Sequence, residues 1–292
     1  MNAPSRRRPG TPDPVPEERT IGKILHARRA GLGTVAVIVA SMALGALVWP
    51  RVAEQVRSGD DTVLHPEAIE LRGQAPWVRA DIRTEALRNA SLDHGLPLTD
   101  PELPNRLARA FDMHPWVRRV VRVDLRHPAA ATIEVECREP AAMVGVAGGL
   151  LAVDAEGVVL PSADFTAEAA ASYPRLAGID SSPQGPEGAV WGDPAVEEGA
   201  ALAHVIQPEW RALGLSECRA VLVSGGEVQR RVWELIGADG FVFVFGAAPG
   251  REEPGEASAA VKIARLKALV GKPSTAAAGR VDLRDEPATP SP

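Results

Sequence analysis

The chain reads VRRVVRVDLRHPAAATIEVECRE from Val117 to Glu139, and this stretch decides how the first folded part is built. In Val117–Arg126 and again in Thr132–Glu139, apolar side chains alternate with charged ones, which is the period of a strand with one buried face. Outward arginines of the first run can pair with outward glutamates of the second, and such cross-strand pairs help to set the register. The stretch therefore predicts an antiparallel hairpin.

One strand and two helices are expected before this hairpin. Val63–Arg72 has the pattern of a strand that ends at Gly73, and Ala80–Ala90 carries small and apolar residues along one helical stripe. A second helix is expected to begin at Thr99–Glu102, because a threonine three residues before a glutamate forms a capping box and proline suits the first turn. The predicted order is strand, helix, helix, strand, strand.

An uncharged apolar segment lies before these elements. Gly31–Trp49 reads GLGTVAVIVASMALGALVW, and a helix of this length spans roughly 28 Å, close to the hydrocarbon thickness of a bilayer. Two alternatives fit less well: a buried globular helix is seldom this long and apolar, and a cleaved signal peptide usually has a shorter apolar part. The segment predicts an uncleaved transmembrane helix.

Charge is distributed unevenly on the two sides of this segment. Residues 1–30 hold seven Lys or Arg residues and three acids, whereas residues 51–292 hold 25 basic and 35 acidic residues. The positive-inside rule therefore places the N-terminus in the cytoplasm and the rest of the chain outside the cytoplasmic membrane. The net charge of −6 argues against nucleic acid as the main partner.

A second folded part is expected after residue 139, with hairpins, two helices and a terminal strand. A turn at Asp239-Gly240 favours a hairpin. The expected elements are hairpins at Leu151–Leu160 and Val228–Phe245, helices at Pro194–Leu213 (capped by Asp193) and Lys262–Val270, and a final strand at Arg280–Arg284. The predicted fold class is α+β, with a mainly antiparallel sheet and flanking helices in this second part.

Several short motifs in this order resemble a known family. Gly73 after the first strand, Pro115-Trp116-Val117 before the hairpin and Arg138-Glu139-Pro140-Ala141 after it resemble the POTRA module. Behind a single membrane helix, this arrangement is similar to the FtsQ/DivIB family of bacterial cell-division proteins. Further matches to that family are Tyr173-Pro-Arg-Leu-Ala-Gly178 and Val281-Asp-Leu-Arg284, so that the likeness covers about residues 62–284.

The resemblance implies both an organisation and a function. The implied parts are a cytoplasmic tail (1–30), a transmembrane helix (31–49), a linker (50–61), a POTRA domain (62–139), a C-terminal β domain (140–286) and a tail (287–292). The implied function is that of a non-catalytic divisome scaffold. Its C-terminal domain would bind membrane-anchored coiled-coil subunits of the FtsB/FtsL type outside the cytoplasmic (inner) membrane, while the POTRA domain would aid recruitment to the septum.

Two surfaces are candidates for partner binding. Arg230 matches a family arginine that borders the partner surface, and an exposed guanidinium suits a bidentate bond to a carboxylate; the alternative is two surface arginines beside a core tryptophan. The terminal strand could accept a partner strand by β-augmentation, although this chain lacks the aromatic residue of the family pattern and Pro287 removes a backbone donor. The predicted partner-binding residues are Arg230, Arg231, Arg280, Val281, Asp282, Leu283 and Arg284, and we expect Arg230 and Arg280–Arg284 to share one exposed face.

Enzyme chemistry finds little support in the sequence. The chain has no His-Glu-x-x-His and no Gly-x-Ser-x-Gly motif, its six histidines lack ligand-like spacing, and two cysteines cannot build a four-thiolate zinc site. We therefore expect no catalytic activity, metal, cofactor or small-molecule substrate. Two other classes stay open, a POTRA-bearing adaptor for secretion or envelope assembly and a membrane-anchored envelope enzyme.

Overall fold

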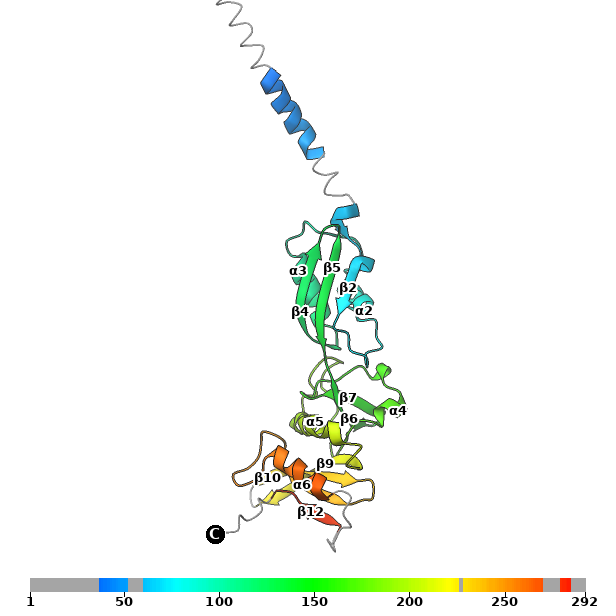
Figure 1. Cartoon of the computed structure of the whole chain (residues 1–292), viewed down its shortest axis with the longest axis vertical. Helices are drawn as coiled ribbons and strands as arrows, with labels where there is room; N and C mark the ends of the chain where they lie inside the picture. Colours follow the sequence, from blue (N-terminus) through cyan, green and yellow to red (C-terminus); the bar gives the residue numbers. More distant parts are fainter. Residues whose placement is uncertain (1–36, 52–59, 226–227, 270–278, 285–292) are drawn as a thin grey trace, which may run out of the picture. The chain divides into compact units, whose positions relative to one another are not determined.

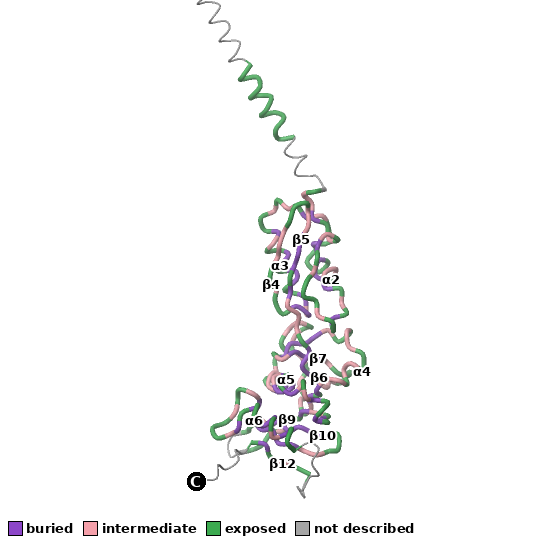
Figure 2. The backbone as a smooth tube through the Cα atoms, viewed as in Figure 1, coloured by how far each residue is buried: buried purple, intermediate pink, exposed green. Residues whose placement is uncertain are grey.

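The computed structural model describes residues 37–51, 60–225, 228–269 and 279–284, which fall into two units, Met1–Gly59 and Asp60–Pro292. In the first unit, residues 37–51 are helical with exposed side chains (Figure 2), Trp49 among them. None of the helices among the described residues is both long and apolar enough to cross a membrane. Gly31, the predicted cytoplasmic tail and Pro287 lie outside the described residues.

The second unit begins with a three-stranded sheet and two helices (Figure 1). Helices α2 (Ile82–Asn89) and α3 (Leu103–Asp112) follow strand β2 (Ile69–Arg72), and strands β4 (Val117–Arg126) and β5 (Ala130–Cys137) follow the helices. The strand order is β2-β5-β4, with β4 antiparallel and β2 parallel to β5. The predicted order of strand, helix, helix, strand, strand is thus confirmed. We call residues 60–139 the first region.

Two local predictions in the first region are wrong. The expected strand Val63–Arg72 is interrupted by a 3-10 turn at Pro66–Ala68, because proline has no N–H to continue a ladder; this leaves a short β1 (Val63–Leu64) that pairs with β3 (Leu96–Pro97). Helix α3 begins only at Leu103, because the Asp100 carboxylate accepts the Glu102 N–H at 2.9 Å in a turn before the helix. The capping box therefore does not form.

Strand β4 also departs from strict alternation. Its pairing with β5 shifts between Val120 and Arg122, so that Val121 bulges outward and is 48% exposed, while Val120 and Val123 pack against the core. Arg122 lies opposite Glu134 in the register. The outward faces of the two strands therefore carry opposite charges, as the sequence predicts.

A seven-stranded sheet occupies the second region, residues 140–284. Its strands are β6 (Pro140–Val146), β7 (Gly149–Asp154), β8 (Arg175–Ala177), β9 (Leu215–Gly225), β10 (Val228–Gly237), β11 (Val242–Gly246) and β12 (Arg280–Asp282). The order is β12-β11-β10-β9-β8-β6-β7; the three long pairings are antiparallel and the three short ones, β6–β8, β8–β9 and β11–β12, are parallel. The α+β class is therefore confirmed, with the longest pairings antiparallel.

Helices α5 (Pro194–Ile206) and α6 (Ala259–Leu269) pack against this sheet, and a short α4 (Ala167–Ala170) lies near β7 (Figure 1). Asp193 caps α5 as predicted, since its carboxylate accepts the Ala195 N–H at 2.8 Å. The helix ends seven residues earlier than predicted. The chain tightens into a 3-10 turn at Gln207–Glu209, which contains a proline.

Candidate partner-binding surface

Strand β12 forms one edge of the seven-stranded sheet, and its outer backbone groups point away from the sheet. Among the residues that the structure describes, it pairs only with β11, with Val281 opposite Phe243. The N–H of Leu283 donates to the Val244 carbonyl at 2.9 Å, and Gly279 accepts from Val242 at 2.9 Å. Because hydrogen bonds alternate along a strand, the N–H and C=O of Arg280 and of Asp282 point toward the outer edge.

The side chains of β12 divide between the two faces of the sheet. Val281 packs against the core and Leu283 is buried within it. The Arg280 guanidinium lies on the opposite face, half exposed, and donates to the Glu234 carboxylate of β10 at 2.6 Å. Arg284 donates to Asp282 at 2.6 Å, and this hydrogen bond is the main cause that lowers the pKa of Asp282.

Arg230 lies on the same face of the sheet as Arg280. It precedes Glu234 by four residues on β10, and side chains an even number apart on a strand share a face. Its side chain is 55% exposed, and Nη1 lies 2.5 Å from the Glu253 carboxylate. Arg231 instead points to the helical side, where it donates to Glu198 of α5 at 2.9 Å.

The structure therefore brings together only part of the predicted set. Arg230, Arg280, Asp282 and Arg284 lie on one exposed face, whereas Arg231, Val281 and Leu283 lie on the core side. The neighbouring tryptophan of β10 is fully buried, as a core residue. Arg280 and Arg284 lie at the strand edge, and Arg230 lies on the same face two strands further into the sheet, each bound to a carboxylate of the same chain.

Sequence reasoning missed a buried ion pair that supports this surface. Lys262 of α6 is fully buried; its Nζ donates to Glu256 at 2.6 Å and to the Ala247 carbonyl at 3.3 Å, and it lies 4.5 Å from the centre of the Phe245 ring. The signal was present in the sequence, because Lys262 lies one turn before the buried Leu266 on the same helical stripe.

The Lys262–Glu256 pair organises the loop at residues 247–258. Burial raises the pKa of Glu256, but its hydrogen bonds with Lys262 and with two backbone N–H groups outweigh burial and leave the pKa below its ordinary value. The loop reaches both parts of the candidate surface: Glu253 contacts Arg230, and the Ala257 N–H donates to the Arg284 carbonyl at 3.0 Å. The pair therefore helps to hold the surface in shape.

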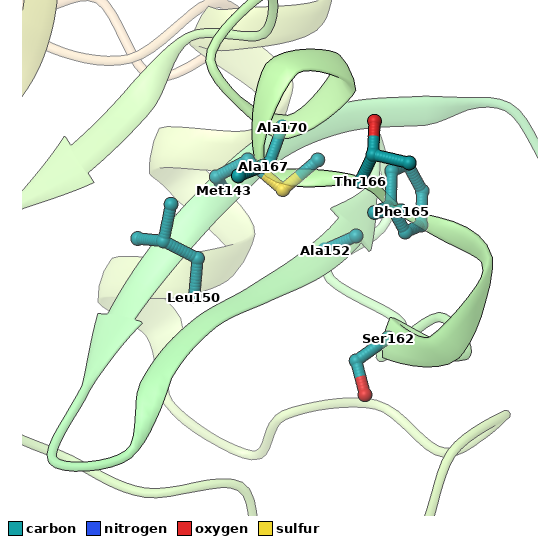
Figure 3. A pocket seen from close by; sticks show the side chains of 8 residues that line it. All are labelled: Met143, Leu150, Ala152, Ser162, Phe165, Thr166, Ala167 and Ala170. Atoms are coloured by element: carbon teal, nitrogen blue, oxygen red, sulfur yellow. The ribbon is translucent and has the colours of Figure 1, made fainter.

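A small pocket lies at the opposite edge of the sheet. A cavity of about 240 Å³ lies between β6, β7 and the α4 segment. Figure 3 shows the side chains that line it, which are mainly apolar, such as Met143, Leu150 and Phe165, with the Ser162 and Thr166 hydroxyls as the polar groups. Such a lining offers no acid, base or metal ligand. In the described part of the chain, no group of three His, Cys, Asp or Glu side chains is placed to hold a metal ion.

Comparison with known proteins gives one informative match. No protein-family model matches the chain. A protein named cell division protein FtsQ, from Myxococcus fulvus, is 31% identical over 153 residues, which are 52% of this chain and 51% of that protein. The chain thus matches about half the length of this relative, and the match supports a general role in cell division. The resemblance to the FtsQ/DivIB family of bacterial cell-division proteins, predicted from the motifs of the sequence, is therefore confirmed by a named relative.

Proposed function

We propose that this protein is a non-catalytic scaffold of the bacterial divisome. Residues 31–49 would anchor it in the cytoplasmic membrane with the N-terminus inside, as the basic residues before this segment favour. Both folded regions would then lie outside the membrane, at the division septum. The first region would act as a POTRA domain that aids recruitment, and its βααββ order supports this assignment.

The observation that carries the proposal is the open edge of β12 beside the exposed arginines. A partner strand that pairs with the outward groups of Arg280 and Asp282 gains main-chain hydrogen bonds, which give affinity without sequence preference. Carboxylates on that segment can bind Arg230 and Arg280, which gives specificity. Membrane-anchored coiled-coil subunits of the FtsB/FtsL type are the proposed partners, each with an acidic extended segment after its coiled coil.

Replacing Asp282 by proline tests the strand edge. Proline removes the outward N–H at position 282, whereas β12 pairs with β11 through residues 279, 281 and 283. We expect the Asp282→Pro chain to lose at least about tenfold in partner affinity. The measurement is co-purification of the division proteins after crosslinking in cells, followed by titration of the purified partner.

The matched control for this variant is Asp282→Ala. Alanine removes the carboxylate that pairs with Arg284 but keeps the backbone N–H, so binding should stay within about threefold of the unchanged chain. Equal thermal unfolding of the two variants shows that the sheet is intact. Unchanged partner capture by Asp282→Pro would rule out strand addition at this edge.

A second substitution tests the arginine face. Arg230→Ala should weaken partner binding about threefold to thirtyfold, because it removes a charged donor from a partner carboxylate. Arg211, exposed in the turn before β9, provides the control, and Arg211→Ala should bind normally. Equal losses in both variants would point to a general effect of charge instead of a contact at Arg230.

A further inference from the structure

The core of the first region is completed by residues of the second region. Trp116, at the start of β4, is fully buried, and its ring centre lies 5.9 Å from that of Phe165. Met143, Ala152 and Leu160 belong to the same apolar cluster as α2, α3 and the first sheet. The first region alone would expose the ring of Trp116, and a tryptophan buries roughly 150–250 Å².

A half-buried polar contact joins the two regions at the same place. The Asp164 carboxylate, in the 3-10 turn Ser162–Asp164, accepts the indole N–H of Trp116 at 2.6 Å and the backbone N–H of Ala80 at 3.4 Å. Both donors belong to the first region. Separation of the two regions would leave these groups without their partner, and a buried donor that loses its acceptor is strongly unfavourable unless water replaces it.

A third contact lies where the chain passes from one region to the other. Arg138 donates to Asp154 at 2.7 Å, and their side chains are only 15% and 7% exposed. Asp154 also accepts the N–H groups of Glu156 and Val158, so that the same carboxylate shapes a turn in the second region. Only two residues separate β5 from β6. The junction therefore contains a buried ion pair where a flexible linker would contain solvated backbone.

We propose that the first and second regions unfold as a single cooperative unit, locked at Trp116 and Asp164, so that a protein bound to either region stabilises both. This coupling does not depend on which partner binds. A partner that binds only the folded state, present at 100 times its Kd, would lower the unfolded fraction of both regions about 100-fold. Recruitment through one region and binding through the other would thus reinforce each other.

Hydrogen exchange on the full chain in detergent micelles tests this coupling. Leu235 on β10 is fully buried in the cluster under α5 and α6 and belongs to the second region alone. Leu235→Ala should accelerate exchange of the slowest amides by at least about 30-fold. The decisive measurement is amide exchange in α3 of the first region. If the regions unfold together, the exchange rate of the α3 amides rises by the same factor as that of the β10 amides.

The reciprocal variant and a milder one keep the test decisive. Leu107→Ala in α3 should accelerate amide exchange in β10 by the same factor as in α3. Asp164→Ala should accelerate amide exchange in both elements. Asp180 is an exposed acid nearby in the sequence, and Asp180→Ala should change the exchange rate of neither element. Asp164→Ala also serves if the two leucine variants do not fold. Acceleration confined to the region that carries the substitution would overturn the proposal.

Discussion

Replacing Gly73 by alanine is expected to lower the free energy of unfolding by about 2–5 kcal/mol. Gly73 follows β2 with φ of +87°, which is the left-handed region that L side chains rarely adopt. A Cβ at this position would overlap the backbone carbonyl of Val135 on β5, and a backbone atom of a central strand cannot move aside cheaply. Backbone strain of about 1–2 kcal/mol and overpacking of about 1–3 kcal/mol add up to a large fraction of the roughly 5–15 kcal/mol that stabilises a typical domain.

Gly214 provides the matched control for this prediction. It also has positive φ, +61°, but no atom lies within 4 Å of a Cβ built there. Gly214→Ala should therefore lower the free energy of unfolding by only about 1 kcal/mol. Urea unfolding of both variants, followed by tryptophan fluorescence, measures the difference. Equal stability of the two variants would contradict the close approach of Gly73 to β5.

Replacing Lys262 by methionine is expected to lower the free energy of unfolding by about 3–5 kcal/mol. Methionine fills the space of the lysine stem but leaves the Glu256 carboxylate buried without its cation, since Glu256 has only 8% of its side chain exposed. Adding Glu256→Gln to Lys262→Met removes that charge, and we expect it to restore part of the lost free energy. Urea unfolding of the single and double variants measures both effects.

The pH dependence of this pair has a defined sign. The pKa of Glu256 is lowered in the folded protein, so its ion pair contributes stability above the pKa of the unfolded carboxyl, near 4.5, and this contribution is lost as the pH falls through the lower folded value. The difference in stability between the unchanged chain and Lys262→Met should therefore shrink as the pH falls through the range in which Glu256 becomes protonated in both folded chains. If the difference in the free energy of unfolding stayed constant from pH 7 to pH 3, the pKa of Glu256 in the folded protein would not depend on Lys262.

Regular periodicity made the main elements predictable from the sequence. The alternation after Val117 identified β4 and β5, and Asp193 before a proline marked the start of α5, because each signal is local. The bulge at Val121 was not predictable, since alternation cannot show where one strand holds an extra residue. The late start of α3 has a similar cause, because the turn at Asp100 competes with the capping box for the same backbone groups.

The candidate surface was predictable only in part. Arg231 and Trp233 are two residues apart on one strand, so their side chains lie on the same face of the sheet. Once Trp233 is assigned to the core, Arg231 can therefore be assigned to the helical side from the sequence. The role of Glu253 depends on how a loop returns to β10, which is long-range information that local patterns do not contain. The burial of Lys262 was not predicted, because buried lysines are rare and occur mainly with a paired carboxylate.

The most direct test of a divisome scaffold is where the protein lies and what its loss does in dividing cells. A fluorescent protein fused to the N-terminus, ahead of residue 1, would report its position in cells from which the untagged protein can be depleted. The account predicts a band at mid-cell and filamentous cells after depletion. A uniform envelope signal together with normal division after depletion would contradict it.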